Sequence, residues 1–134
     1  MQNKFYSSYP NVLTNCTILA HDGSTKHYLG KSKIGRVIIG DRVFVGHKAT
    51  ILCGVTIGDD VIIGVNTVVT RDIPSNSVVV GCPGKIIGKT SDYISKHEYF
   101  MKEKPVYNTY WKDKTENEKQ EIKKSLVNTF GYDE

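Results

Sequence analysis

An aliphatic residue recurs at every sixth position through the middle of the chain, and no other feature constrains the fold as much. The series is Ile39, Val45, Ile51, Ile57, Ile63 and Val69, and small or β-branched residues stand two positions earlier at Val37, Val43, Ala49, Val55, Val61 and Thr67. An amphipathic α-helix repeats its apolar positions every three or four residues, so a period of six argues against one. The period predicts short strands separated by turns and stacked into coils that share one core.

Glycine follows the aliphatic residue in four of these hexads, at Gly40, Gly46, Gly58 and Gly64. Because glycine adopts backbone angles that other residues resist, we expect these glycines to supply the conformation that the turns require.

The repeat is interrupted near its beginning. Val12 and Ile18 show the same spacing, but Ile18 and Ile39 are 21 residues apart, three more than three hexads would need. No repeat can be traced between Ala20 and Arg36. We therefore predict a loop excursion over residues 20–36, and polar loops on a rigid scaffold commonly carry function.

Composition and charge divide the chain into two parts. Residues 1–90 hold ten Lys and Arg against five Asp and Glu, whereas residues 91–134 hold eight against nine. A basic repeat domain suits a phosphorylated small molecule or a nucleic acid. Nucleic-acid binding is disfavoured because eight of the thirteen aromatic residues lie in the acidic tail rather than among the basic residues. No apolar stretch resembles a secretory signal or a membrane span, so we expect a cytoplasmic protein with no membrane partner.

The tail after residue 90 predicts a helical, aromatic extension. Ser91 or Asp92 is suited to cap a helix that ends before Pro105. Thr115 and Glu118 form a capping-box pattern that opens a second helix. We assign residues 1–90 to the repeat domain and residues 91–134 to this extension.

The repeat resembles that of the hexapeptide-repeat acetyltransferases. The resemblance is carried by Ile39-Gly-Asp-Arg-Val-Phe-Val-Gly, by residues 54–74 and by the closing Val80-Gly-Cys-Pro-Gly-Lys-Ile-Ile-Gly, and it covers roughly residues 11–89. The chain is most similar to maltose and galactoside O-acetyltransferases and to the sugar O-acetyltransferases of polysaccharide biosynthesis. This resemblance implies an all-β, left-handed parallel β-helix that forms homotrimers, with active sites between neighbouring subunits.

The resemblance also implies a catalytic histidine. Acyl transfer to a hydroxyl needs a base, and histidine is suited to that role because its neutral form accepts a proton near pH 7. His21 leads the excursion, at the place where the resembling enzymes carry their catalytic histidine, so we predict it as the base. Asp22 is predicted to orient His21 or to contact the acceptor. Without the resemblance, a surface residue in a turn would be the better interpretation of His21. A solvated side chain remains the better interpretation of His47 and His97, and His27 is a weaker catalytic candidate than His21.

Acetyl-CoA is the acyl donor that the resemblance implies. Thr70, Arg71 and Lys85 match polar and basic positions that hold CoA in the family, and basic side chains suit its phosphates. His47 and Val65 match turn positions whose backbone amides meet the pantetheine arm. Phe44 matches an aromatic position that packs on the cofactor, although packing at a subunit interface is an equal alternative.

The sequence therefore predicts an acetyl-CoA-dependent O-acetyltransferase that acts on a hydroxyl of a sugar or saccharide precursor. An N-acetyltransferase of an amino sugar nucleotide is an alternative. A non-catalytic β-helix that binds or scaffolds is a second one, because the resembling enzymes have several coils before their histidine. A zinc site of His21, His27 and His47 ranks lower, since two of them share one irregular loop, and we expect no metal.

Overall fold

The computed structural model describes residues 11–134, and the chain divides into two compact units after Tyr93. The first unit contains the repeat, and the second contains the C-terminal segment. Each unit is described by itself.

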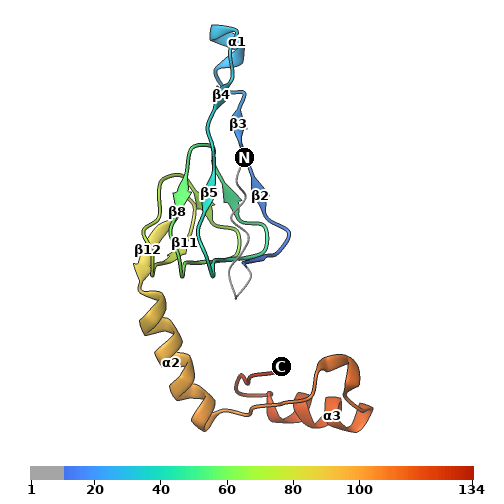
Figure 1. Cartoon of the computed structure of the whole chain (residues 1–134). Helices are drawn as coiled ribbons and strands as arrows, with labels where there is room; N and C mark the ends of the chain where they lie inside the picture. Colours follow the sequence, from blue (N-terminus) through green and yellow to red (C-terminus); the bar gives the residue numbers. More distant parts are fainter. Residues whose placement is uncertain (1–10) are drawn as a thin grey trace. The chain divides into compact units, whose positions relative to one another are not determined.

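Short parallel strands of the first unit stack in register as a β-helix with three faces (Figure 1). Face one holds β1 (Val12–Leu13), β6 (Phe44–Val45), β9 (Ile62–Ile63), β11 (Val78–Val80) and the antiparallel β12 (Lys85–Gly88). Face two holds β2 (Thr17–Ile18), β7 (Thr50–Ile51) and β10 (Val68–Val69), and face three holds β5 (Ile38–Ile39), β8 (Thr56–Ile57) and Ile73. The parallel β-helix predicted from the six-residue period is confirmed.

The core consists of the two predicted series. Residues 43, 45, 49, 51, 55, 57, 61, 63, 67 and 69 are all buried, and each is either the repeated aliphatic residue or the residue two before it. Because alternate residues of a strand point to opposite faces, the residue between each pair points outward. Val37 and Ile39, in the first coil, are only partly buried against this core.

The sequence underestimated the length of the interruption. Val45 pairs with Ile63, 18 positions further along, whereas Ile18 pairs with Ile51, 33 positions further along. The first coil is therefore longer than the next by 15 residues, and the predicted excess of three was wrong. The estimate assumed three regular hexads between Ile18 and Ile39, but only one corner separates them.

The extra residues form an arm that projects from the coils (Figure 1). Strand β3 (His21–Asp22) pairs antiparallel with β4 (Lys33–Ile34), and the short helix α1 (Lys26–Leu29) lies between them. The Gly35 amide donates to the Ala20 carbonyl at 3.0 Å and closes the base of the arm. The predicted excursion is thus an ordered hairpin.

The expected role of the hexad glycines was wrong. Gly40, Gly46, Gly58 and Gly64 do not have positive φ angles, whereas the residues two positions after them, Arg42, Lys48, Asp60 and Asn66, have φ angles of 54° to 58°. The glycines are required because neighbouring coils approach too closely for a side chain. A Cβ atom on Gly40 would lie 2.7 Å from the carbonyl carbon of Gly58 in the next coil.

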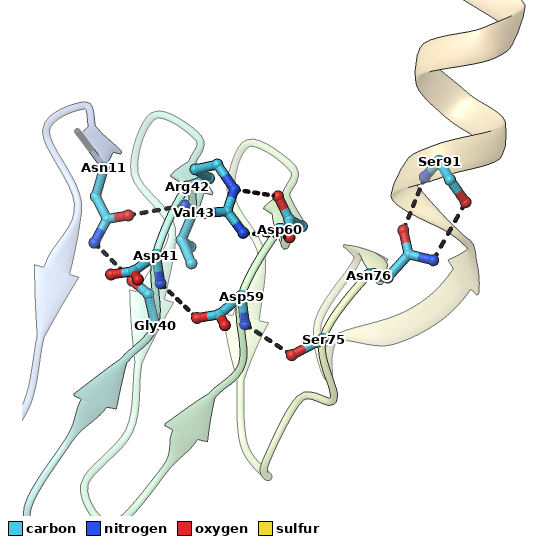
Figure 2. A network of polar contacts seen from close by, with 10 residues as sticks. All are labelled: Asn11, Gly40, Asp41, Arg42, Val43, Asp59, Asp60, Ser75, Asn76 and Ser91. Carbon is cyan, nitrogen blue, oxygen red and sulfur yellow. Dashed lines mark hydrogen bonds and ion pairs between the residues drawn. The ribbon is translucent and has the colours of Figure 1, made fainter. Parts of the chain in front are cut away.

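A ladder of polar contacts joins the coils along the corner between faces three and one (Figure 2). The Arg42 guanidinium donates to both carboxylate oxygens of Asp60, at 2.6 and 2.7 Å, and this contact lowers the pKa of Asp60. The Asp41 amide donates to the Asp59 carboxylate at 2.7 Å. The ion pair joins two residues with a left-handed backbone, a conformation that an Arg residue adopts rarely.

The second unit is built on helices. Helix α2 (Thr90–Glu103) crosses the unit boundary, and the 3₁₀ helix η1 (Trp111–Asp113) and α3 (Glu116–Ser125) follow. The capping box of Thr115 and Glu118 is confirmed, with both reciprocal hydrogen bonds present. Helix α2 already begins at Thr90, so Ser91 and Asp92 lie within its first turn. Within residues 11–134, no helix has the length and apolar character to cross a membrane.

The close approach of coils at Gly40 can be tested by substitution. We expect Gly40→Ala to lower the free energy of unfolding by about 1–3 kcal/mol, because backbone atoms of Gly58 cannot move aside without shifting a coil. Gly88→Ala is the matched control, since a Cβ atom there would meet nothing within 4 Å. Urea denaturation would measure both, and equal stability of the two variants would contradict this role for Gly40.

Candidate functional site

Four of the predicted cofactor residues gather around the corner between faces one and two. Phe44 points outward from face one and is 41% exposed. The Asn66 amide donates to the His47 carbonyl at 3.0 Å, so the turn containing Val65 stacks directly on the turn containing His47. Lys85 pairs with Val80, the last residue of β11, at the same end of face one.

The backbone at this corner offers hydrogen-bond donors. Among residues 11–134, the amides of His47 and Val65 have no acceptor, although the neighbouring amides of Lys48 and Asn66 each donate to another coil. Gly46 is buried, and a Cβ atom on it would lie 2.7 Å from the Val65 nitrogen, so glycine lets the two turns stack closely. Backbone N–H groups of this kind can donate to carbonyl oxygens, and we call this corner, with Phe44, His47, Val65 and Lys85, the cradle. The sequence suggested the two amides but not the close contact at Gly46.

The remaining predicted residues lie around the corner between faces two and three. His21 is exposed at the start of the arm, and its imidazole has no hydrogen-bond partner among the described residues. The Leu52 amide donates to the Val69 carbonyl and the Leu19 amide to the Ile51 carbonyl, so three successive coils stack here. Thr70 and Arg71 are exposed on the third of these coils, about 10 Å from the base of the arm at the usual strand spacing.

Asp22 contributes to the turn of the arm. Its carboxylate accepts the Ser24 amide at 2.8 Å, and this hydrogen bond, together with one to the Ser24 side chain, lowers the pKa of Asp22. Asp22 also follows His21 directly in β3, so the two side chains point to opposite faces of the hairpin. The geometry favours a turn-forming role for Asp22 over one that orients His21.

A single chain does not bring the two groups of residues together. His47 and Cys53 are six positions apart across face two, and strand geometry makes that distance up to about 20 Å. The arm also projects away from the coils rather than across face two (Figure 1). His21 and the cradle at His47 therefore lie on different corners of the same β-helix.

The arm exposes three large apolar side chains. Tyr28 is 84% exposed, Leu29 72% and Ile34 78%. Exposed apolar side chains that cluster on one element mark a contact surface. Most residues of this loop are polar, and its sequence alone gave no sign of these three residues.

A metal centre finds no support in the residues that the structure describes. Within residues 11–134, no group of three or more His, Cys, Asp or Glu side chains is placed to hold a metal ion. The three histidines considered for zinc, His21, His27 and His47, lie partly on the arm and partly on a different corner.

Comparisons with known proteins agree with this architecture. Residues 36–71 match the family model described as the hexapeptide repeat of succinyl-transferase. Galactoside O-acetyltransferase of Escherichia coli (strain K12) is 44% identical over 64 residues, which are 48% of this chain and 31% of that protein. The crystal structure of a maltose O-acetyltransferase from Clostridium difficile 630 superposes with a TM-score of 0.51 and 40% identity, over 56% of this chain and 42% of that one.

A galactoside acetyltransferase in complex with coenzyme A also matches. Its TM-score is 0.59 at 32% identity, and the match covers 63% of this chain and 44% of that chain. The chain spans less than half of the length of each of these three proteins.

The role of Asp22 can be tested by limited trypsin digestion, because Lys26, Lys31 and Lys33 lie in the arm. We expect Asp22→Ala to speed cleavage roughly fivefold, the effect of losing a hydrogen bond worth about 1 kcal/mol. Asp22→Asn keeps an acceptor for the Ser24 amide and is expected to be cleaved at nearly the rate of the unaltered protein. Identical rates for all three proteins would contradict a turn-forming role.

Proposed function

We propose that this chain is an acetyl-CoA-dependent O-acetyltransferase of the hexapeptide-repeat family whose acceptor is a hydroxyl of a sugar or saccharide precursor. The match of residues 36–71 to a hexapeptide-repeat model and the similarity to acetyltransferases support this proposal. The observation that carries the proposal is the cradle at His47 and Val65, where two stacked backbone amides have no acceptor among residues 11–134. The names of the maltose and galactoside O-acetyltransferases support the choice of a sugar hydroxyl.

The residues present suit acetyl-CoA. The amides of His47 and Val65 would donate to the amide carbonyls of the pantetheine arm, and Phe44 offers an exposed ring beside them. Lys85 would meet a phosphate at the same corner, with Thr70 and Arg71 contributing from the other corner. Acetyl-CoA supplies the acetyl group as a thioester, which oxygen nucleophiles attack readily.

His21 would act as the general base. One ring nitrogen of the imidazole accepts the proton of the acceptor hydroxyl as its oxygen bonds to the acetyl carbon. The same nitrogen returns that proton to the sulfur as the carbon–sulfur bond breaks. An acetyl group has then moved from sulfur to oxygen, and His21 is neutral again. Asp22 would act only by shaping the turn that presents His21.

A homotrimer of left-handed β-helices would complete the site. The outward side chains of face one include Val12, Phe44 and Val80, all exposed and apolar, and sheets of parallel strands are normally covered on both faces. The arm, which leaves the coils at the corner between faces two and three, exposes Tyr28 and Leu29. A head-to-tail ring pairs two different surfaces, so the arm of one copy would meet face one of the next.

Acetyl-CoA binding can be tested by thermal unfolding. A ligand that binds only the folded protein raises the midpoint in a concentration-dependent way, by about 2.7 kcal/mol of stabilisation at one hundred times its Kd. We expect acetyl-CoA to raise the midpoint of the unaltered protein and to raise it much less in Arg71→Ala/Lys85→Ala. Lys123→Ala is the control, because Lys123 is an exposed basic residue of the second unit.

Turnover is the second readout of the same experiment. Release of the CoA thiol in the presence of a sugar acceptor should fall by about 10²- to 10⁴-fold in His21→Ala, the usual contribution of a general base. His21→Ala should still show the acetyl-CoA shift. If saturating acetyl-CoA leaves the midpoint of the unaltered protein unchanged, the proposed function is wrong and a scaffolding role takes its place.

A further inference from the structure

The second unit contains a hollow that the proposed chemistry does not use. Its volume is about 460 Å³, within the range of small-molecule sites. One wall is the extended segment 106–109, and the other is one side of α3. The lining residues are Val106, Tyr107, Asn108, Thr109, Lys114, Asn117, Glu118, Glu121 and Ile122.

Contacts behind each wall hold the hollow in shape. The Tyr107 hydroxyl lies 2.6 Å from the Ser125 hydroxyl and so ties the extended segment to α3. The Tyr107 amide donates to the Tyr132 carbonyl at 2.9 Å, which fixes the same segment from its other side. The Lys114 ammonium donates to the Asp133 carboxylate at 2.8 Å. Because the walls are already ordered, a ligand would bind without first folding its site.

Every charge in the hollow has a partner. The Lys114 side chain is only 2% exposed, and its ammonium lowers the pKa of Asp133. The Glu118 carboxylate accepts the Thr115 amide at 2.6 Å, and this hydrogen bond lowers the pKa of Glu118. Glu121 lies 3.6 Å from the Lys124 ammonium. The one cation of the lining is already paired and its other charged groups are carboxylates. The hollow therefore has little attraction for an anion such as a phosphate, and a neutral ligand suits it better than an anion.

The neutral polar side chains are the ones left without partners. Among residues 11–134, the side chains of Asn108, Thr109 and Asn117 make no hydrogen bond within the protein, and all three residues are exposed. An amide offers both donors and an acceptor, so two amides and a hydroxyl can match neighbouring hydroxyl groups of a ligand. Val106, Ile122 and the Tyr107 ring supply apolar surface between them.

We propose that this hollow binds a neutral saccharide, with the sugar hydroxyls on Asn108 and Asn117 and a C–H face of the sugar on Tyr107 and Ile122. All residues of the proposed binding site belong to the second unit, so saccharide binding does not depend on the proposed function. Its role as a holding site for the saccharide acceptor rests on the proposed function, because only then does the protein act on a sugar.

Isothermal titration of the full chain with maltose and with lactose tests the proposal. We expect saturable binding of at least one of them, and no binding of glucuronate or glucosamine-6-phosphate, which are anionic. Asn117→Ala should weaken binding roughly threefold to tenfold, the effect of one hydrogen bond worth about 1 kcal/mol. Gln120→Ala is the matched control, since Gln120 is an exposed amide on α3 that does not line the hollow.

Two outcomes would overturn the inference. One is the absence of saturable binding for both disaccharides, and the other is an equal loss of affinity in Asn117→Ala and Gln120→Ala. Trp111 is the only tryptophan of the chain and lies between the two walls in sequence, so its fluorescence would report the same binding independently. If the acetyl-CoA shift persists while no sugar binds, only this inference fails. If a sugar binds but acetyl-CoA does not, the proposed function fails and the saccharide site stands.

Discussion

The in-register stacking of one coil on the next is the constraint on which the rest of the first unit depends. Val45 lies beside Ile63 and Ile39 beside Ile57, each 18 positions further along the chain. Strands in neighbouring coils are then separated by the usual hydrogen-bonding distance of about 4.8 Å. At the corners this separation leaves no room for a Cβ atom between Gly40 and Gly58. The sharp turns instead place Arg42 and Asp60 in the left-handed region, where the ion pair between their side chains joins the two coils (Figure 2).

The stacking of coils also determines which residues can lie close enough together to form one site. Residues one coil apart become neighbours, so the side chains and amides of equivalent positions form columns along a corner. His47 and Val65 make one such column, and Arg71 lies on another, above the base of the arm that carries His21. The β-helix cannot move these corners closer, because the buried core holds all three faces rigidly. A site that needs both columns therefore needs the arm of one copy beside the cradle of another.

The sequence predicted most of the fold because the period of six acts directly on the core. Every sixth residue from Val45 to Val69 is buried, as is the residue two before it. The number of residues between Ile18 and Ile39 could not give the length of the arm. The same 21 positions fit either three hexads with three extra residues or one corner with fifteen extra residues. The sequence also could not explain why the hexads need glycine. The clash that a side chain would cause is with the next coil, and it is visible only when the coils are stacked. The candidate residues came from family resemblance, whereas their division between two corners emerged only from the register of the strands.

We propose that the active site forms between copies, and mixing two inactive variants tests this arrangement most directly. His21→Ala removes the proposed base, and Phe44→Ala/Lys85→Glu alters the cradle on the other corner. Each variant alone is expected to be inactive. Co-expressed in equal amounts, they should regain about a quarter of the activity of the unaltered protein, because about one interface in four of a head-to-tail ring would join an intact arm to an intact cradle. A mixture that stays as inactive as its components would contradict the account.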